Sequence, residues 1–264
     1  MARERPRFGY RRLHAMLGGE ERVNHKRVWR IYREAGLSIR RKRRKRLARA
    51  GRPLEPATLA NEEWALDFVS DAIATGRSIR LLNIADAYTR ECLALEVDTS
   101  FASRRVTRVL ERVIAERGAP RRIRCDNGPE LTSRHFVAWC VERKIDLLHI
   151  RPGKPAQNGR LESMNGKLRD EFLNLSWFRN LFDARRQAAI WRRDYNEARP
   201  HSSLGYRTPA AFASGSNTVT SPSNTPLSEA GDRSQGDPAG ALRAALTPAP
   251  VLAFRSTEEG EVTH

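Results

Sequence analysis

Apolar positions along this chain repeat with two different periods, and the change of period separates a short helical region from a larger mixed one. In residues 8–37 the period is helical and a Gly-Gly pair interrupts it, which predicts two helices joined by a turn. The apolar positions are Tyr10, Leu13 and Leu17 in the first helix, and Val28, Ile31, Tyr32 and Ala35 in the second. We therefore expect residues 1–39 to form a partial helix-turn-helix-like DNA-binding segment, with Lys26 and Arg27 as contacts. A solvated basic face on a small helical hairpin is the alternative.

From residue 61 onward short apolar runs alternate with turns and amphipathic stretches. The first three runs are separated by short turns and predict an antiparallel meander. The expected strands cover residues 64–69, 80–85, 92–97, 122–125 and 145–150, and the expected helices cover 103–117, 133–143, the segment around Glu162, and 183–197. Three antiparallel strands followed by alternating helix and strand predict an α/β fold of the ribonuclease-H type, with a mixed five-stranded sheet and flanking helices over residues 61–213.

Charge is concentrated at the N-terminal end of the chain. The net charge is +17, and residues 1–52 hold 19 Lys and Arg against 4 acids. Within a basic linker, residues 40–60, lies an unbroken cationic run. Its candidate DNA contacts are Arg41, Lys42, Arg43, Arg44, Lys45 and Arg46. Such a run favours a polyanionic partner and sequence-independent phosphate binding, with a solvated linker as the alternative.

The remaining composition excludes several classes of protein. Three cysteines without paired spacing indicate neither a disulfide framework nor a zinc site, and fit a reduced cytoplasmic setting. No apolar run approaches a membrane span, so we expect no membrane partner. Residues 214–264 are rich in Ser, Thr, Pro, Gly and Ala and are predicted to be a disordered tail.

Three carboxylates are candidates for catalysis and metal binding. Asp67 has apolar neighbours on both sides, where an ionised carboxylate is costly unless it is paired or bound to metal. Asp126 ends a predicted strand before an Asn-Gly turn, and Glu162 follows it after 35 intervening residues. Carboxylates without a His or Cys cluster favour Mg²⁺ or Mn²⁺. Two such ions can promote an in-line displacement at phosphorus.

Polar residues around Glu162 are candidate DNA contacts. Asn158, Asn165 and Arg169 form one stripe with Glu162 on the predicted helix, which we expect to face solvent. Lys154, in the preceding Pro- and Gly-containing loop, and Lys167 supply nearby positive charge. We expect these five residues to contact DNA near the site.

Four segments carry a resemblance to a known family. They are Trp64–Phe68, Asp126–Leu131, Arg151–Asn174 and Tyr195–Leu204. They resemble the catalytic OrfB subunit of bacterial insertion-sequence transposases, within the retroviral-integrase-like superfamily. The resemblance implies an integrase core with an Asp–Asp–(35)–Glu triad at Asp67, Asp126 and Glu162. It also implies magnesium-dependent nicking at element ends followed by strand transfer.

The resemblance has implications for partners as well. It implies DNA ends and target DNA as substrates, a homo-oligomer on DNA, and a cytoplasmic, nucleoid-associated protein in bacteria. Arg169 matches a position whose basic residue contacts terminal bases or phosphates. The helical segment begins almost at Met1, whereas the family usually carries further helices before it. One hypothesis is therefore that a separate upstream reading frame supplies a partner subunit. Two rival functions are a plain ribonuclease-H-like nuclease and a truncated DNA-binding remnant.

Overall fold

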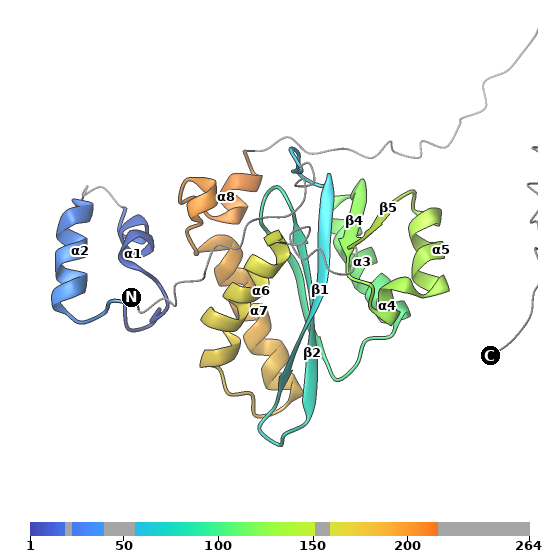
Figure 1. Cartoon of the computed structure of the whole chain (residues 1–264), viewed down its shortest axis with the longest axis horizontal. Coiled ribbons are helices and arrows are strands. Elements are labelled where there is room, and N and C mark those ends of the chain that lie inside the picture. Colours follow the sequence, from blue (N-terminus) through green and yellow to red (C-terminus); the bar gives the residue numbers. More distant parts are fainter. Residues whose placement is uncertain (19–22, 40–55, 151–158, 216–264) are drawn as a thin grey trace, which may run out of the picture. The chain divides into compact units, whose positions relative to one another are not determined.

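A computed structural model describes residues 1–18, 23–39, 56–150 and 159–215 of the chain (Figure 1). These residues all belong to one unit, Met1–Ser223. The strands are β1 (Glu63–Ala72), β2 (Ser78–Asp86), β3 (Cys92–Asp98), β4 (Arg122–Cys125) and β5 (Asp146–His149). The helices are α1 (Tyr10–Met16), α2 (His25–Glu34), α3 (Ser103–Arg117), α4 (Pro129–Thr132), α5 (Arg134–Glu142), α6 (Gly159–Glu171), α7 (Leu181–Glu197) and α8 (Pro209–Ala213), with 3₁₀ turns at Leu173–Leu175 and Ser202–Leu204.

The two N-terminal helices form where the apolar pattern predicts them. Asn24 caps α2, since its side chain accepts the backbone N–H of Lys26 at 2.9 Å. Phe8, Leu13 and Tyr32 form the small core between the helices. Ile31, another of the apolar positions of α2, lies outside this core, because its side chain is 52% exposed. The small helical pair has room to bury only part of the apolar surface of α2.

The sheet has the order β3-β2-β1-β4-β5. β1, β2 and β3 pair antiparallel, while β4 pairs parallel with β1 and β5 parallel with β4. The predicted meander and mixed five-stranded sheet are therefore confirmed. The register places Asp67 directly opposite Asn83. Directly opposite residues in an antiparallel pair share one face of the sheet, so these two polar side chains are neighbours.

Helices cover both faces of the sheet (Figure 1). Trp64 and Leu66 of β1 join a core with residues of α3 and α5, while Ala65 and Val69 join a core with residues of α6 and α7. Because side chains alternate along a strand, Asp67 lies on the same face as Ala65 and Val69. The alternation of β1 therefore directs this acid toward the face covered by α6. No helix in the described part of the chain is long and apolar enough to cross a membrane.

Candidate active site

Asp67 lies on β1 between the sheet and α6. Its Oδ2 accepts a hydrogen bond from Asn165 Nδ2 at 2.7 Å, and its Oδ1 accepts the backbone N–H of Phe68 at 2.8 Å. Asn165 Oδ1 in turn accepts Asn83 Nδ2 at 2.8 Å, so one chain of hydrogen bonds links β2, α6 and β1. Burial, together with the charges of Asp126 and Glu162, raises the pKa of Asp67 to about 6, although its hydrogen bonds oppose this shift.

Asp126 follows the last residue of β4 and begins a tightly bonded loop. Its Oδ1 accepts the backbone N–H of Gly128 at 3.1 Å, and Asn127 Nδ2 donates to the carbonyl of Ile150 at 2.9 Å. A Cβ on Gly128 would come within 3.1 Å of Asp126 Oδ1 and 3.0 Å of Glu130 Oε2. The glycine therefore lets the loop fold closely around two carboxylates.

Glu162 lies in the first turn of α6, and its side chain is exposed. The opposite side of the helix is buried through Met164, Leu168 and Phe172, which pack against the sheet. Because that side packs inward, Glu162 lies exposed near the N-terminal end of α6. Since Asp126 and Glu162 both raise the pKa of Asp67, the three acids lie within electrostatic range of one another.

The three acids suit a hard divalent cation by their chemistry, because each offers only carboxylate oxygens. Within the described ranges, no group of three or more His, Cys, Asp or Glu side chains is close enough together to hold a metal ion as it stands. Burial is the largest cause of the raised pKa of Asp67, and the charges of Asp126 and Glu162 add to it, so a bound cation would favour the ionised carboxylate.

The predicted DNA contacts fall into different environments. Asn165 does not extend into solvent as expected, because its amide binds Asp67 and Asn83. Arg169 is exposed, and Lys167 is partly buried and lines a cavity. The other contacts predicted in the loop before α6 and in the basic linker lie outside the described residues. They are Arg41, Lys42, Arg43, Arg44, Lys45, Arg46, Lys154 and Asn158.

Lys26 and Arg27, the contacts predicted on α2, are exposed and line a surface groove of about 710 Å³. Asn24, Trp29 and Tyr10 also border this groove. Basic and aromatic side chains along one groove are compatible with a nucleic-acid surface.

Glu130 is a neighbour of the site that the sequence did not single out. Its carboxylate pairs with Arg80, whose guanidinium lies 4.2 Å from the centre of the Phe68 ring. Burial is the largest single influence and opposes ionisation of Glu130, but the hydrogen bond and charge of Arg80, together with a backbone N–H bond, outweigh it and lower the pKa. The sequence Asp-Asn-Gly-Pro-Glu could have indicated Glu130, because it places a second acid four residues after Asp126 in the same loop.

The thiol beside Asp126 is poorly suited to act as a nucleophile. Cys125 is buried, and burial raises its pKa to about 12. Its Sγ lies 3.6 Å from His149 Nδ1, which also lies 3.1 Å from the backbone oxygen of Asp126. A thiol with that pKa carries almost no thiolate at neutral pH.

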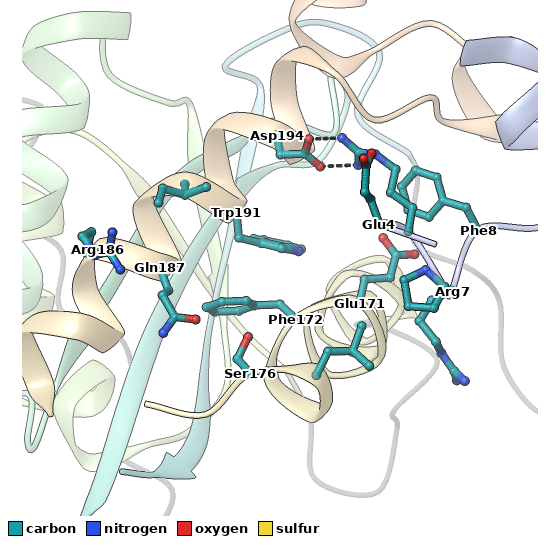
Figure 2. A pocket seen from close by; sticks show the side chains of 14 residues that line it. Glu4, Arg7, Phe8, Glu171, Phe172, Ser176, Arg186, Gln187, Trp191 and Asp194 are labelled. Carbon is teal, nitrogen blue, oxygen red and sulfur yellow. Dashed lines mark hydrogen bonds and ion pairs between the residues drawn. The ribbon is translucent and has the colours of Figure 1, made fainter. Parts of the chain in front are cut away.

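Ion pairs join the N-terminal segment to the helices that bear the site. Arg5 pairs with Asp194 of α7, and Arg12 Nη1 donates to Glu171 Oε1 of α6 at 2.8 Å. Arg199 also holds Glu171, through Nε at 2.5 Å and Nη2 at 2.6 Å. Figure 2 shows Asp194 and Glu171 at a cavity of about 560 Å³, which Arg5 also lines. Glu171, at the end of α6, therefore receives bonds from both the N-terminal segment and the segment after α7.

Known families and proteins match most of the chain. The integrase core domain family matches residues 57–155 and 143–209, and the HTH-like domain family matches residues 1–46. The insertion element IS407 uncharacterized 31.7 kDa protein of Burkholderia multivorans is 47% identical over 219 residues, 81% of this chain and 78% of that protein. Transposase InsD for insertion element IS2A/D/F/H/I/K of Escherichia coli is 27% identical over 225 residues, 79% of this chain and 74% of that protein.

A solved structure supports the fold. The chain resembles one in the simian T-cell lymphotropic virus intasome in complex with PP2A regulatory subunit B56 gamma, with a TM-score of 0.55 and 17% identity. The match covers 84% of this chain and 81% of that one. The sheet order and this likeness confirm the ribonuclease-H-like integrase fold. The family matches and the 47% identical relative show that the chain belongs to the integrase-core family of insertion-element transposases.

Proposed function

We propose that this transposase nicks DNA at element ends and joins the freed 3′-hydroxyl to target DNA, with Asp67, Asp126 and Glu162 as its metal-binding catalytic residues. The observation that carries the proposal is the raised pKa of Asp67, to which Asp126 and Glu162 both contribute after burial. Acids separated widely in sequence act on one carboxylate, and strongly perturbed groups of this kind cluster at functional sites.

Each part of the chain has a distinct task in this reaction. The bond from Asn165 fixes the rotamer of Asp67, and the bond from the Gly128 N–H fixes Asp126. Glu162 completes the set from the exposed end of α6. Two bound Mg²⁺ or Mn²⁺ ions would supply activation of the attacking oxygen and charge neutralisation at the scissile phosphate. The exposed Arg169, seven residues after Glu162, is a candidate contact for the DNA end.

The test is a strand-transfer assay with labelled DNA carrying the terminal sequences of the parent element, with Mg²⁺ present. Glu162→Gln should abolish both nicking and joining while leaving DNA binding within about twofold, since it removes a metal ligand and no phosphate contact. Glu142→Gln, the same change at an exposed position of α5, is the matched control and should retain activity. Full activity of Glu162→Gln would rule out the assignment.

The same assay separates this proposal from its rivals. A plain nuclease would give hydrolysed ends without joined products. A DNA-binding remnant would bind ends without metal-dependent cleavage, even after the product of an upstream reading frame is supplied. Homo-oligomer formation on DNA belongs to the proposal and can be measured as the mass of the complex with end DNA.

A further inference from the structure

We propose that a cavity beside Glu162 binds one backbone phosphate of the DNA through Lys167, Ser163, Arg90 and Ser203. The inference rests on the proposed DNA substrate and adds to it a specific anion pocket. The cavity has a volume of about 230 Å³, and Ser163, which directly follows Glu162, lies on its wall. At about 30 Å³ per water, the space equals roughly eight water volumes, which is enough for a phosphate group and part of its hydration.

Segments distant in sequence supply the polar groups of this pocket. Ser163 and Lys167 are four residues apart on α6 and therefore lie on one face of the helix. Arg90 comes from the β2–β3 turn, and Ser203 from the 3₁₀ turn after α7. Ala65 and Ala85 form part of the floor, and their small side chains leave the space open. Two hydroxyls and two cations around one cavity match the acceptor oxygens of a phosphate.

Lys167 carries a positive charge that its surroundings do not balance. Its ammonium forms no hydrogen bond or ion pair with any residue that the structure describes, and it is partly buried. Burial and the charges of Arg199, Arg12 and Arg90 lower its pKa to about 8. The charge of Glu171 opposes this shift, but both Arg199 and Arg12 already bind that carboxylate. Because these neighbouring positive charges disfavour the charged form of Lys167, a bound anion would stabilise its ammonium group.

Asp86 also lines the cavity, but its carboxylate is occupied by hydrogen bonds within the fold. Its carboxylate accepts backbone N–H groups from Asn61 at 2.8 Å, Tyr88 at 2.8 Å and Thr89 at 2.9 Å. These bonds close the turn that carries Arg90, whose φ of 66° lies in the left-handed region. That conformation is less favourable for an arginine than for a glycine. The hydrogen bonds of Asp86 therefore hold the backbone of the turn from which Arg90 reaches the cavity.

The test compares Lys167→Gln with Lys144→Gln in DNA binding without Mg²⁺, as a function of salt. Lys144 is an exposed lysine in the turn before β5 and serves as the matched control. Losing one phosphate contact lowers the slope of log K against log salt by about 0.9. Wild type and Lys144→Gln should therefore lose about threefold more affinity than Lys167→Gln when salt rises fourfold. Ser203→Ala, on an exposed turn, should weaken DNA binding in the same direction without disturbing the core.

Inorganic phosphate distinguishes the source of the anion. Phosphate should raise the melting temperature of wild type more than that of Lys167→Gln, and DNA should abolish the difference. If phosphate stabilisation depends on Lys167 but the salt slope of DNA binding does not, the pocket takes a free anion and the DNA assignment is wrong. If neither measurement depends on Lys167, the pocket binds no phosphate. Because binding is measured without Mg²⁺, these outcomes are independent of whether the triad catalyses the reaction.

Discussion

Replacing Asp67 with asparagine should make the metal-free protein more stable at pH 8 while abolishing its chemistry. Burial and two neighbouring acids raise the pKa of Asp67 from 3.8 to about 6. The folded state therefore favours the protonated acid. The resulting stabilisation is fully present below pH 4 and is lost as pH rises through 6. At pH 8 the ionised carboxylate opposes folding, and asparagine removes that charge.

The magnitude follows from the size of the pKa shift. A shift of about two units corresponds to about 3 kcal/mol, at 1.36 kcal/mol per unit. Asp67 is only half-buried and screened by water, so we expect about 1–2 kcal/mol, or about 2–8 °C in melting temperature. An asparagine at this position also fits the hydrogen-bond chain. If the amides of Asn165 and Asn83 reverse, the introduced amide can donate to Asn165 and keep its own oxygen for the Phe68 N–H.

The assay is thermal unfolding of wild type and Asp67→Asn in EDTA at pH 5 and pH 8. The stability advantage of the variant should grow between the two pH values. Asp71→Asn, on the same strand, is the control and should change stability by less than about 0.5 kcal/mol. Added Mg²⁺ should stabilise wild type and leave Asp67→Asn unchanged. A variant less stable than wild type at pH 8, or an advantage independent of pH, would refute the electrostatic reasoning.

Two further perturbations test other parts of the molecule. Glu171→Ala leaves Arg199, which is 1% exposed, without its carboxylate partner. The free energy of unfolding, measured by urea titration, should therefore fall by about 3–5 kcal/mol. A loss below about 1 kcal/mol would contradict the importance of the buried pair. Neutralising Arg41–Arg46 should weaken binding to all DNA sequences and flatten its salt dependence, measured by fluorescence anisotropy. An unchanged salt slope would show that this run makes no phosphate contacts.

The strands could be predicted, and Asp67 could be singled out as a candidate, because their signals are local. Apolar runs with turn residues between them locate β1, β2 and β3 within a few residues, and the first predicted amphipathic helix of the sheet region coincides with α3. Asp67 stands out because it is a charge among apolar neighbours. The short helices α4 and α8 were not predicted, because four or five residues carry too little periodicity to be recognised.

The surroundings of the three candidate acids could not be predicted, because they depend on how α6 packs on the sheet. Asn165 belongs to a polar stripe on α6, and polarity alone predicts that such a stripe faces solvent. In the fold it meets Asp67 and Asn83, two polar positions on adjacent strands. The pocket around Lys167 likewise needs Arg90 from the β2–β3 turn, more than 70 residues away in sequence. Only the packing of α6 on the sheet brings such groups together.

Helix α6 carries Glu162 near one end and contacts the N-terminal segment at the other, so that segment is expected to influence the orientation of Glu162. Its first turn carries Glu162, its middle carries Asn165, and its last residue, Glu171, is bound by Arg12 and Arg199. A helix is stiff along its axis, so a change at Glu171 shifts the position of Glu162 about 13 Å away, taking roughly 1.5 Å per residue over nine residues. Loss of the Arg12 contact would remove one of the two arginines that bind Glu171 and would leave Arg199 bound to it.

We therefore expect Arg12→Ala to lower the rate of nicking more than it lowers stability, because the remaining pair still holds the fold while the orientation of Glu162 is less restrained. Single-turnover nicking of labelled end DNA and urea titration of the same variant measure the two effects. A nicking rate equal to that of wild type, in a variant that still binds the DNA, would show that Arg199 alone orients α6 and that the N-terminal segment has no part in positioning Glu162.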